Sequence, residues 1–358
     1  MAKGARLLGV DLVRGFAAYG VVVIHTLGNQ PRSPSGARFV ALFLGFAVPY
    51  FLAVSLYLTA GRLLSKGPHG FLRSRIERMI VPYLVWTSLF VAFRVLLYVS
   101  SGRSAELPAL VGSPLPLILL GKAAAPLYFV PLLFVGEVTA VGLCRALGGR
   151  LGSSSAIVPF ALLGVVLSWF DTSRRDPLWN DRSLSDLDRV GLTLASDWLW
   201  CLPFIAFAFL FQLPEVRRRT GSIPLYALPA LAASLMALDW IGAAYGSAAF
   251  LPFATRELIL AFGCLAGAVA VSSVIRPARW IDSLSACTFG IYLVHPLVIE
   301  ANELMLRRAH LLGGEEGAAP WIAALAAVSF AMSWVVVSWT MRVRVLARFL
   351  YGVRPRPA

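Results

Sequence analysis

Long apolar runs constrain this chain more than any other feature of its sequence. Residues 39–58 form a run of twenty residues without a charge, and residues 196–213 are interrupted only by Asp197 near one edge. An α-helix needs about 20 mostly apolar residues to cross the hydrocarbon core of a bilayer. Of the 358 residues, 58% are hydrophobic and 14% are charged, whereas a soluble domain is nearer half apolar and a quarter charged. These runs predict a membrane protein.

The sequence supplies about ten such segments, and the predicted fold is therefore all-α, a polytopic membrane helical bundle of about ten transmembrane helices. The fourth segment is over-long and contains Pro126 and Pro131, which predicts either a bend or a short re-entrant piece before one span. No repeat, low-complexity stretch or soluble domain is evident, so residues 1–358 are expected to form a single membrane domain without a fused soluble domain. The predicted segments are 10–28, 38–60, 79–100, 115–143, 155–171, 196–213, 223–242, 250–273, 283–304 and 319–341.

The net charge of +14 is distributed in a way that indicates topology. Basic residues concentrate in alternate loops, whereas residues 171–189 on the opposite side mix five aspartates with four arginines. By the positive-inside rule both termini are predicted to be cytoplasmic, which agrees with an even number of spans. A nucleic-acid binder would instead gather its basic residues on one water-facing surface, so no nucleic-acid partner is expected.

Neither the cysteines nor the amino terminus suggests another class of protein. The four cysteines are scattered singly and form no C-x-x-C pair, so neither a metal site nor a disulfide framework is predicted. Lys3 and Arg6 precede an apolar stretch, as in a signal peptide. However, Asp11 and Arg14 interrupt the approach and no A-x-A cleavage site follows, so the first helix is expected to be retained.

Ionisable side chains at membrane depth are the natural candidates for function. Each costs roughly 2.5–3.5 kcal/mol on insertion scales, so a charge is kept there only for a reason. The candidates are Arg14, His25, Arg94, Glu137, Asp239, Arg256, Glu257 and His295.

Arg14 and His25 stand eleven residues apart in the first segment. In an α-helix that spacing returns the chain to within about 20° of the same face, with His25 about 16 Å further along the axis. One face would thus carry a fixed cation near the membrane surface and an imidazole in the interior. The alternative is that Arg14 extends to the interface and His25 bonds a neighbouring carbonyl.

Two further groups have spacings that suggest function. Arg75 and Arg78 are three residues apart and therefore predicted to share a helix face, where two guanidiniums could clamp phosphates. Contact with lipid headgroups is the alternative. In the ninth segment Ser285, Thr288, Tyr292 and His295 follow a 3, 4, 3 spacing and predict one polar stripe, which could be functional or could serve interhelical hydrogen bonding.

Three stretches together resemble the acyltransferase-3 family of membrane acyltransferases. Residues 14–25 (RGFAAYGVVVIH) match its arginine, ten residues and histidine, and residues 75–83 (RIERMIVPY) resemble its R-x-x-R signature followed by proline and tyrosine. Residues 288–295 (TFGIYLVH) resemble its late S-Y-G-I-Y-L-x-H motif. Two stretches depart from the family: residues 55–57 (SLY) replace Ser-Gly-Tyr, and residues 126–129 (PLYF) replace a leucine-tryptophan-phenylalanine step.

The resemblance implies an O-acyltransferase that uses acyl-CoA, in the commonest case acetyl-CoA, and no metal. With this resemblance, we expect His25 to be the general base and Arg14 to belong to the catalytic set, and we expect Arg75 and Arg78 to bind the phosphates of the donor. Transfer through an acyl-histidine intermediate stays an open alternative. Tyr292, His295 and Thr288 are candidates for contacting the substrate or the oxyanion.

The expected acceptor is a hydroxyl of a surface or exported glycan, which can be lipid-linked, and the expected location is the cell inner membrane. A small-molecule acceptor and a structural role in polysaccharide assembly are alternatives. A transporter or flippase for a glycan or lipid-linked precursor is another, since buried charges such as Arg94, Glu137 and Asp239 would suit it. Many transporters show a two-half repeat, which is not evident here. The sequence leaves open the acceptor's identity, the acyl chain length, the oligomeric state and whether the acyl group crosses the bilayer.

Overall fold

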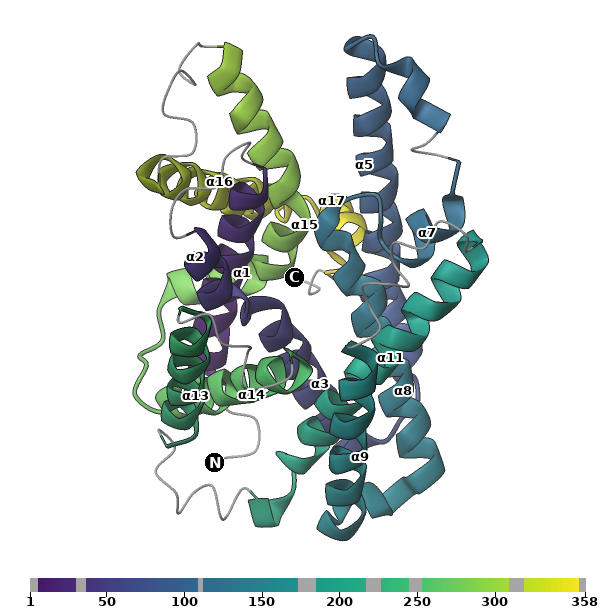
Figure 1. Ribbon diagram of the computed structural model, residues 1–358, viewed down its shortest axis with the longest axis vertical. Helices are drawn as coiled ribbons and strands as arrows, with labels where there is room; N and C mark the ends of the chain where they lie inside the picture. Colours follow the sequence, from purple (N-terminus) through teal and green to yellow (C-terminus); the bar gives the residue numbers. More distant parts are fainter. Residues whose placement is uncertain are drawn as a thin grey trace. The chain divides into compact units, whose positions relative to one another are not determined.

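The computed structural model describes residues 6–29, 37–108, 112–172, 185–216, 227–244, 253–308 and 319–353. All the regular structure in these ranges is helical (Figure 1). This confirms the predicted all-α class. Arg217, Arg218 and Arg219, and residues 173–184 of the loop predicted between the fifth and sixth spans, lie outside the described residues.

Eight helical segments among the described residues are long and apolar enough to cross a membrane, and shorter apolar stretches lie in two more helices, α9 (Ser154–Thr172) and α13 (Ala227–Ala244). Each coincides with one predicted segment, so the polytopic helical architecture is confirmed. The eight are α1 (Leu8–Gly28), α3 (Ala47–Lys66), the continuous segment Phe71–Ser100, the segment Ala125–Leu147, α11 (Asp186–Leu210), α14 (Phe253–Val271), α15 (Arg279–Arg308) and α16 (Ala319–Thr340).

The fourth predicted segment is interrupted, as its prolines indicated. Helix α7 (Pro114–Leu119) ends before Gly121, whose φ of +69° ordinary residues rarely adopt. A 3₁₀ turn (Ala125–Tyr128) then leads into α8 (Phe129–Leu147). Pro131 lies in the first turn of α8, where a missing backbone N–H costs no intrahelical hydrogen bond, so the helix continues through it.

The bounds of several predicted segments were wrong. The second segment, predicted at 38–60, is α2 (Ala37–Leu44) followed by α3, and the third, predicted from residue 79, belongs to a helical segment that starts at Phe71.

Helix α11 begins at Asp186, ten residues before the predicted start of the sixth segment. The hydroxyl of Ser185 accepts a hydrogen bond from the backbone N–H of Asp188 and caps the helix. Asp186 and Asp188 in the first turn also favour a helix start there, because acidic side chains stabilise the positive end of the helix dipole. Hydropathy alone could not find this polar first turn.

The chain forms two compact units. The first unit comprises Met1–Phe51, Leu225–Ala232 and Leu260–Ala347. The second unit comprises Leu52–Pro224, Ala233–Ile259 and Arg348–Ala358.

In the first unit, α1 packs against α15 and α16. Helices α1 and α15 run parallel, because Ser285 bonds Asp11 near the start of both helices and His295 contacts His25 further along both. Helix α16 is antiparallel to α15. The first and ninth of ten alternating spans must run in the same direction, so this pairing agrees with the predicted order of spans.

Gly9 allows α1 to approach α14 closely within the first unit. Its backbone N–H donates to the hydroxyl of Ser272 at 2.9 Å, and a Cβ at this position would lie 2.0 Å from the carbonyl oxygen of Ala268. A backbone atom cannot move aside as a flexible side chain can. The contact therefore requires glycine.

Gly9→Ala is expected to lower the free energy of unfolding by about 1–3 kcal/mol, the usual cost of overpacking. The matched control is Gly28→Ala, at the other end of α1, where a Cβ would have no neighbour within 4 Å. Thermal unfolding of the purified variants in detergent measures the difference. Equal melting temperatures for the two variants would contradict the close α1–α14 packing.

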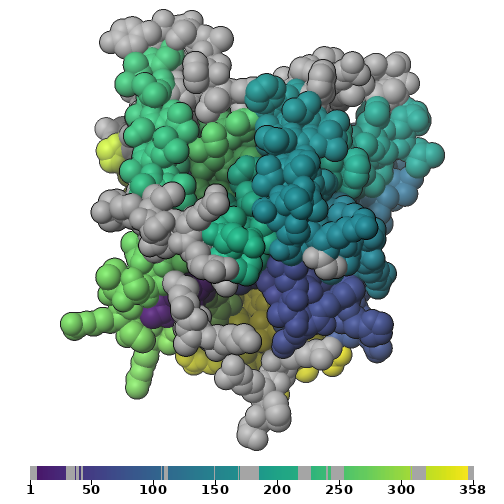
Figure 2. Space-filling view, turned by 90° about the horizontal axis from the view of Figure 1, so that it is seen from below, coloured from purple at the N-terminus to yellow at the C-terminus, as the bar shows by residue number. Residues whose placement is uncertain are grey.

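In the second unit, α9 and α11 lie side by side (Figure 1), and Figure 2 shows their teal surfaces on one face of the molecule. A Cβ on Gly164 of α9 would lie 2.9 Å from the backbone nitrogen of Pro203 in α11. Helix α8 packs on the same α11, where Gly136 faces Cys201. Small residues thus bring the three helices together, as is common for helices in membranes.

Candidate active site

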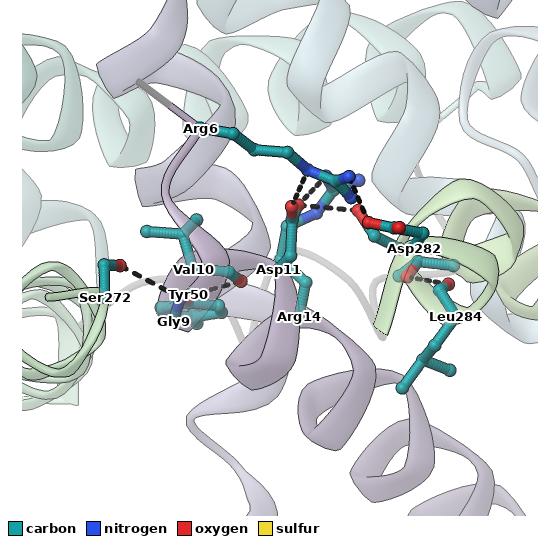
Figure 3. Close-up of polar contacts among 11 residues, drawn as sticks. Arg6, Gly9, Val10, Asp11, Arg14, Tyr50, Ser272, Asp282 and Leu284 are labelled. Carbon is teal, nitrogen blue, oxygen red and sulfur yellow. Dashed lines mark hydrogen bonds and ion pairs between the residues drawn. The ribbon is translucent and has the colours of Figure 1, made fainter. Parts of the chain in front are cut away.

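Arg14 lies in the second turn of α1, beside a network built on Asp11 (Figure 3). The Asp11 carboxylate is largely buried and accepts hydrogen bonds from Arg6 Nε and from the Ser285 hydroxyl, each at 2.6 Å. Arg6 also pairs with Asp282 at the start of α15. The carboxylate is therefore held in place by Arg6, which precedes α1, and by Ser285 of α15.

Arg14 is only loosely engaged by this network. Its Nη1 lies 3.8 Å from Asp11 Oδ1, and this is the one ion pair that Arg14 forms within the described part of the chain. The Arg14 side chain keeps 28% of its exposure. A guanidinium has five N–H donors, so Asp11 can orient Arg14 and still leave donors for a ligand.

His25 lies in the last turn of α1 and contacts His295 of α15. The two ring centroids are 5.2 Å apart and the rings are tilted by 39°. His25 is partly exposed, whereas His295 is fully buried. The structure thus brings together the two histidines that the sequence placed at membrane depth.

The tautomer of His295 follows from its hydrogen bond. Its Nδ1 lies 3.2 Å from the carbonyl oxygen of Ile291. Because a carbonyl can only accept, Nδ1 carries the proton, and Nε2 of the neutral ring is an acceptor. This Nε2 is buried and has no hydrogen-bond partner. The partly exposed imidazole of His25 therefore contacts the buried imidazole of His295, whose Nε2 can accept a hydrogen bond but cannot donate one.

The predicted polar stripe of α15 faces α1. Ser285 bonds Asp11 and His295 contacts His25, both on α1. The Tyr292 ring lies 6.0 Å from that of His295. Thr288 donates its hydroxyl to the carbonyl of Leu284 at 2.8 Å, so its proton is already used in the helix backbone.

Arg75 lies in the second unit and forms a buried ion pair. Its Nη2 is 2.7 Å from Oε1 of Glu137, a residue of α8 with no exposure at all. The Thr59 hydroxyl lies 3.3 Å from both groups, accepting from Arg75 and donating to Glu137. The pair therefore connects α3, α4 (Phe71–Arg75) and α8.

Arg78 differs from Arg75 because the chain between them leaves the α-helical path. Residues Ile76–Ile80 form a π-helical turn, with i→i+5 hydrogen bonds, before α5 (Val81–Ser100). Arg75 is turned toward buried Glu137, whereas Arg78 is exposed. Gly352, with a φ of +64°, packs on the backbone of Arg78, where a Cβ would lie 2.2 Å from its carbonyl oxygen. The three-residue spacing therefore does not give both guanidiniums the same surroundings.

Comparison with known proteins identifies the family. A model of the acyltransferase-3 family, described as an acyltransferase domain, matches residues 7–339. This chain belongs to that family. The fold and the family together make it a multi-pass membrane acyltransferase.

Individual relatives add little detail. An amino-acid racemase of Enterococcus faecalis is 27% identical over 216 residues, which is 56% of this chain. The match covers only 29% of that protein's length. No solved structure matches.

The structure places the predicted site residues of this acyltransferase in two groups. The first unit holds Arg14, His25, Thr288, Tyr292 and His295, and the second unit holds Arg75 and Arg78. Within the described ranges no group of three histidine, cysteine, aspartate or glutamate side chains could hold a metal ion.

Sequence reasoning did not assign a role to Asp11. Its signal was the three-residue spacing to Arg14, which places the two side chains next to each other on a helix.

Proposed function

We propose that this protein is a membrane-bound O-acyltransferase that moves an acyl group, in the simplest case acetyl, from acyl-CoA to a hydroxyl of a surface or exported glycan. The observation that best supports this role is the contact between partly exposed His25 and buried His295 in a chain of the acyltransferase-3 family. Imidazole suits proton transfer near neutral pH, because its unperturbed pKa is close to 6.5.

In the proposed reaction, a nitrogen of His25 takes the proton of the acceptor hydroxyl while the oxygen attacks the thioester carbonyl. The tetrahedral intermediate collapses with cleavage of the C–S bond. The CoA thiolate leaves and takes the proton back from the imidazolium, so His25 returns to its neutral form. An acyl-histidine intermediate is the other route, in which the imidazole itself attacks the thioester.

The arginines are proposed to bind the donor from the cytoplasm, where acyl-CoA is made. Arg75 and Arg78 lie beside the predicted cytoplasmic loop between α3 and α4, and guanidiniums bind phosphate groups with paired hydrogen bonds. Arg14, oriented by Asp11, has donors left for the donor molecule or for the developing oxyanion. Both termini are then cytoplasmic, and the membrane is the cell inner membrane.

Release of CoA by the purified protein tests this function. The protein is supplied with acetyl-CoA, with or without a lipid-linked glycan extract, and free thiol is followed over time. An acyltransferase releases CoA in proportion to added acceptor. Equal release without acceptor would indicate a thioester hydrolase, and no release by folded protein would favour a transporter.

A further inference from the structure

Two arginines contact the ring of Phe71 in the second unit. The Phe71 ring is buried, and the guanidinium carbons of Arg62 and Arg75 lie 5.0 and 5.1 Å from its centroid. Arg62 belongs to the last turns of α3, and Phe71 is the first residue of α4. Cations within about 6 Å of an aromatic ring centroid are attracted to its face. One buried ring thus holds two arginines from different helices close together.

Arg78 adds a third positive charge close enough to act on Arg75, and the charges of the three arginines do not balance. Arg75 is paired with Glu137, but Arg62 and Arg78 are both exposed and form no ion pair in the part of the chain that the structure describes. Both act electrostatically on Arg75. Three guanidiniums against one carboxylate leave two positive charges uncompensated. Neighbouring like charges repel, so such a cluster suits an anionic ligand.

Arg75 also has an unused donor. Its Nε is buried and has no hydrogen-bond partner, although its Nη2 bonds both Glu137 and Thr59. A buried N–H is rarely left unpaired in a folded protein. Glu137 and Thr59 therefore fix the guanidinium without using all of it.

We propose that Arg62 binds the acyl donor, and that Arg62, Arg75 and Arg78 form one three-guanidinium site for its phosphate groups. Glu137 and Phe71 are positioning residues of this site: Glu137 fixes Arg75, and Phe71 keeps Arg62 beside it. The proposal rests on the proposed function. It adds Arg62 of α3 to Arg75 and Arg78, the two arginines that the sequence pattern predicts to bind phosphate.

The ligand chemistry is that of clustered phosphates. Acyl-CoA carries a diphosphate and a separate ribose phosphate, which can engage three guanidiniums at once. A phospholipid headgroup offers the same phosphate chemistry but usually one phosphate at a time. The two sources are distinguished by measuring binding of CoA in bilayers with and without anionic lipid.

The test is equilibrium binding of CoA to the full-length protein in phosphatidylcholine nanodiscs, which needs no acceptor and no turnover. Arg62→Ala is expected to weaken CoA binding about tenfold or more, the effect of losing a charge-assisted hydrogen bond in a site. Arg73→Ala is the matched control, because Arg73 is 89% exposed and already pairs with Glu77 at 3.7 Å. That control should bind CoA within about twofold of the parent. Arg62→Lys keeps the positive charge but loses the paired hydrogen bonds of a guanidinium, so its affinity for CoA should lie between those of the parent and Arg62→Ala.

Two results would overturn the inference. Arg62→Ala could bind CoA as tightly as the parent in phosphatidylcholine nanodiscs; if it then differed from the parent only in bilayers with phosphatidylglycerol, Arg62 would be assigned to lipid. Arg73→Ala could weaken CoA binding as much as Arg62→Ala, which would indicate a general surface charge effect. If the folded parent itself bound no CoA, the proposed function would fail first. If Arg62→Ala did not fold, Arg62→Lys would decide.

Discussion

His25→Ala is expected to lower acyl transfer by about 10²–10⁴-fold, the usual contribution of a positioned general base. His25 is the partly exposed member of the histidine pair, and buried His295 next to it offers only an unprotonated nitrogen. Alanine removes the proton acceptor but leaves the arginines untouched. Affinity for CoA, measured separately, should therefore change by less than about twofold, because phosphate binding does not involve the imidazole.

The matched control for this prediction is His69→Ala. His69 is an exposed residue between Gly67 and Gly70, so the same substitution there should leave transfer unchanged. A His25→Ala protein that turned over at close to the parental rate would remove His25 from the role of base. Equal losses in both variants would instead show that the assay reports folding.

Glu137→Leu is expected to destabilise the protein strongly. Removing one partner of a buried ion pair typically costs about 3–5 kcal/mol, because the other charge stays uncompensated. Here the carboxylate has no exposure and Arg75 has 25%, so water can reach Arg75 only in part. The free energy of unfolding in mild detergent, obtained from denaturant titrations, measures the loss.

Two further variants separate the ion pair from ordinary packing. The double variant Arg75→Met/Glu137→Leu should recover most of the loss, since an apolar pair of similar size often replaces a buried ion pair without cost. Glu77→Gln breaks the exposed pair with Arg73 and should cost less than about 1 kcal/mol. A stable Glu137→Leu single variant would show that Arg75 finds enough water without its partner.

Much of the fold could be predicted because a bilayer imposes a simple length rule. The prediction of ten spans needed only apolar runs of about 20 residues. The polar stripe of α15 was also predictable, since helical periodicity alone places Ser285 and His295 on one face. The structure adds that this face meets α1.

The pairings within the site could not be predicted, for physical reasons. The contacts of His25 with His295 and of Arg75 with Glu137 join distant parts of the chain, and periodicity within one helix carries no information about its neighbours. The π-helical turn at Ile76–Ile80 has no compositional signal, so an α-helical spacing was assumed there. In the sequence, Arg62 looks like any other basic residue of a cytoplasmic loop. Only its position over the Phe71 ring distinguishes it from those residues.

This member of the acyltransferase-3 family is proposed to transfer an acyl group from CoA to a glycan. The most direct test of this transfer is to incubate the protein in proteoliposomes with acetyl-CoA labelled in the acetyl group and with a lipid-linked glycan extract. The label should move to the glycan with the parental protein and not with His25→Ala. Label recovered only as acetyl-CoA or free acetate, from protein that is folded and binds CoA, would contradict the claim.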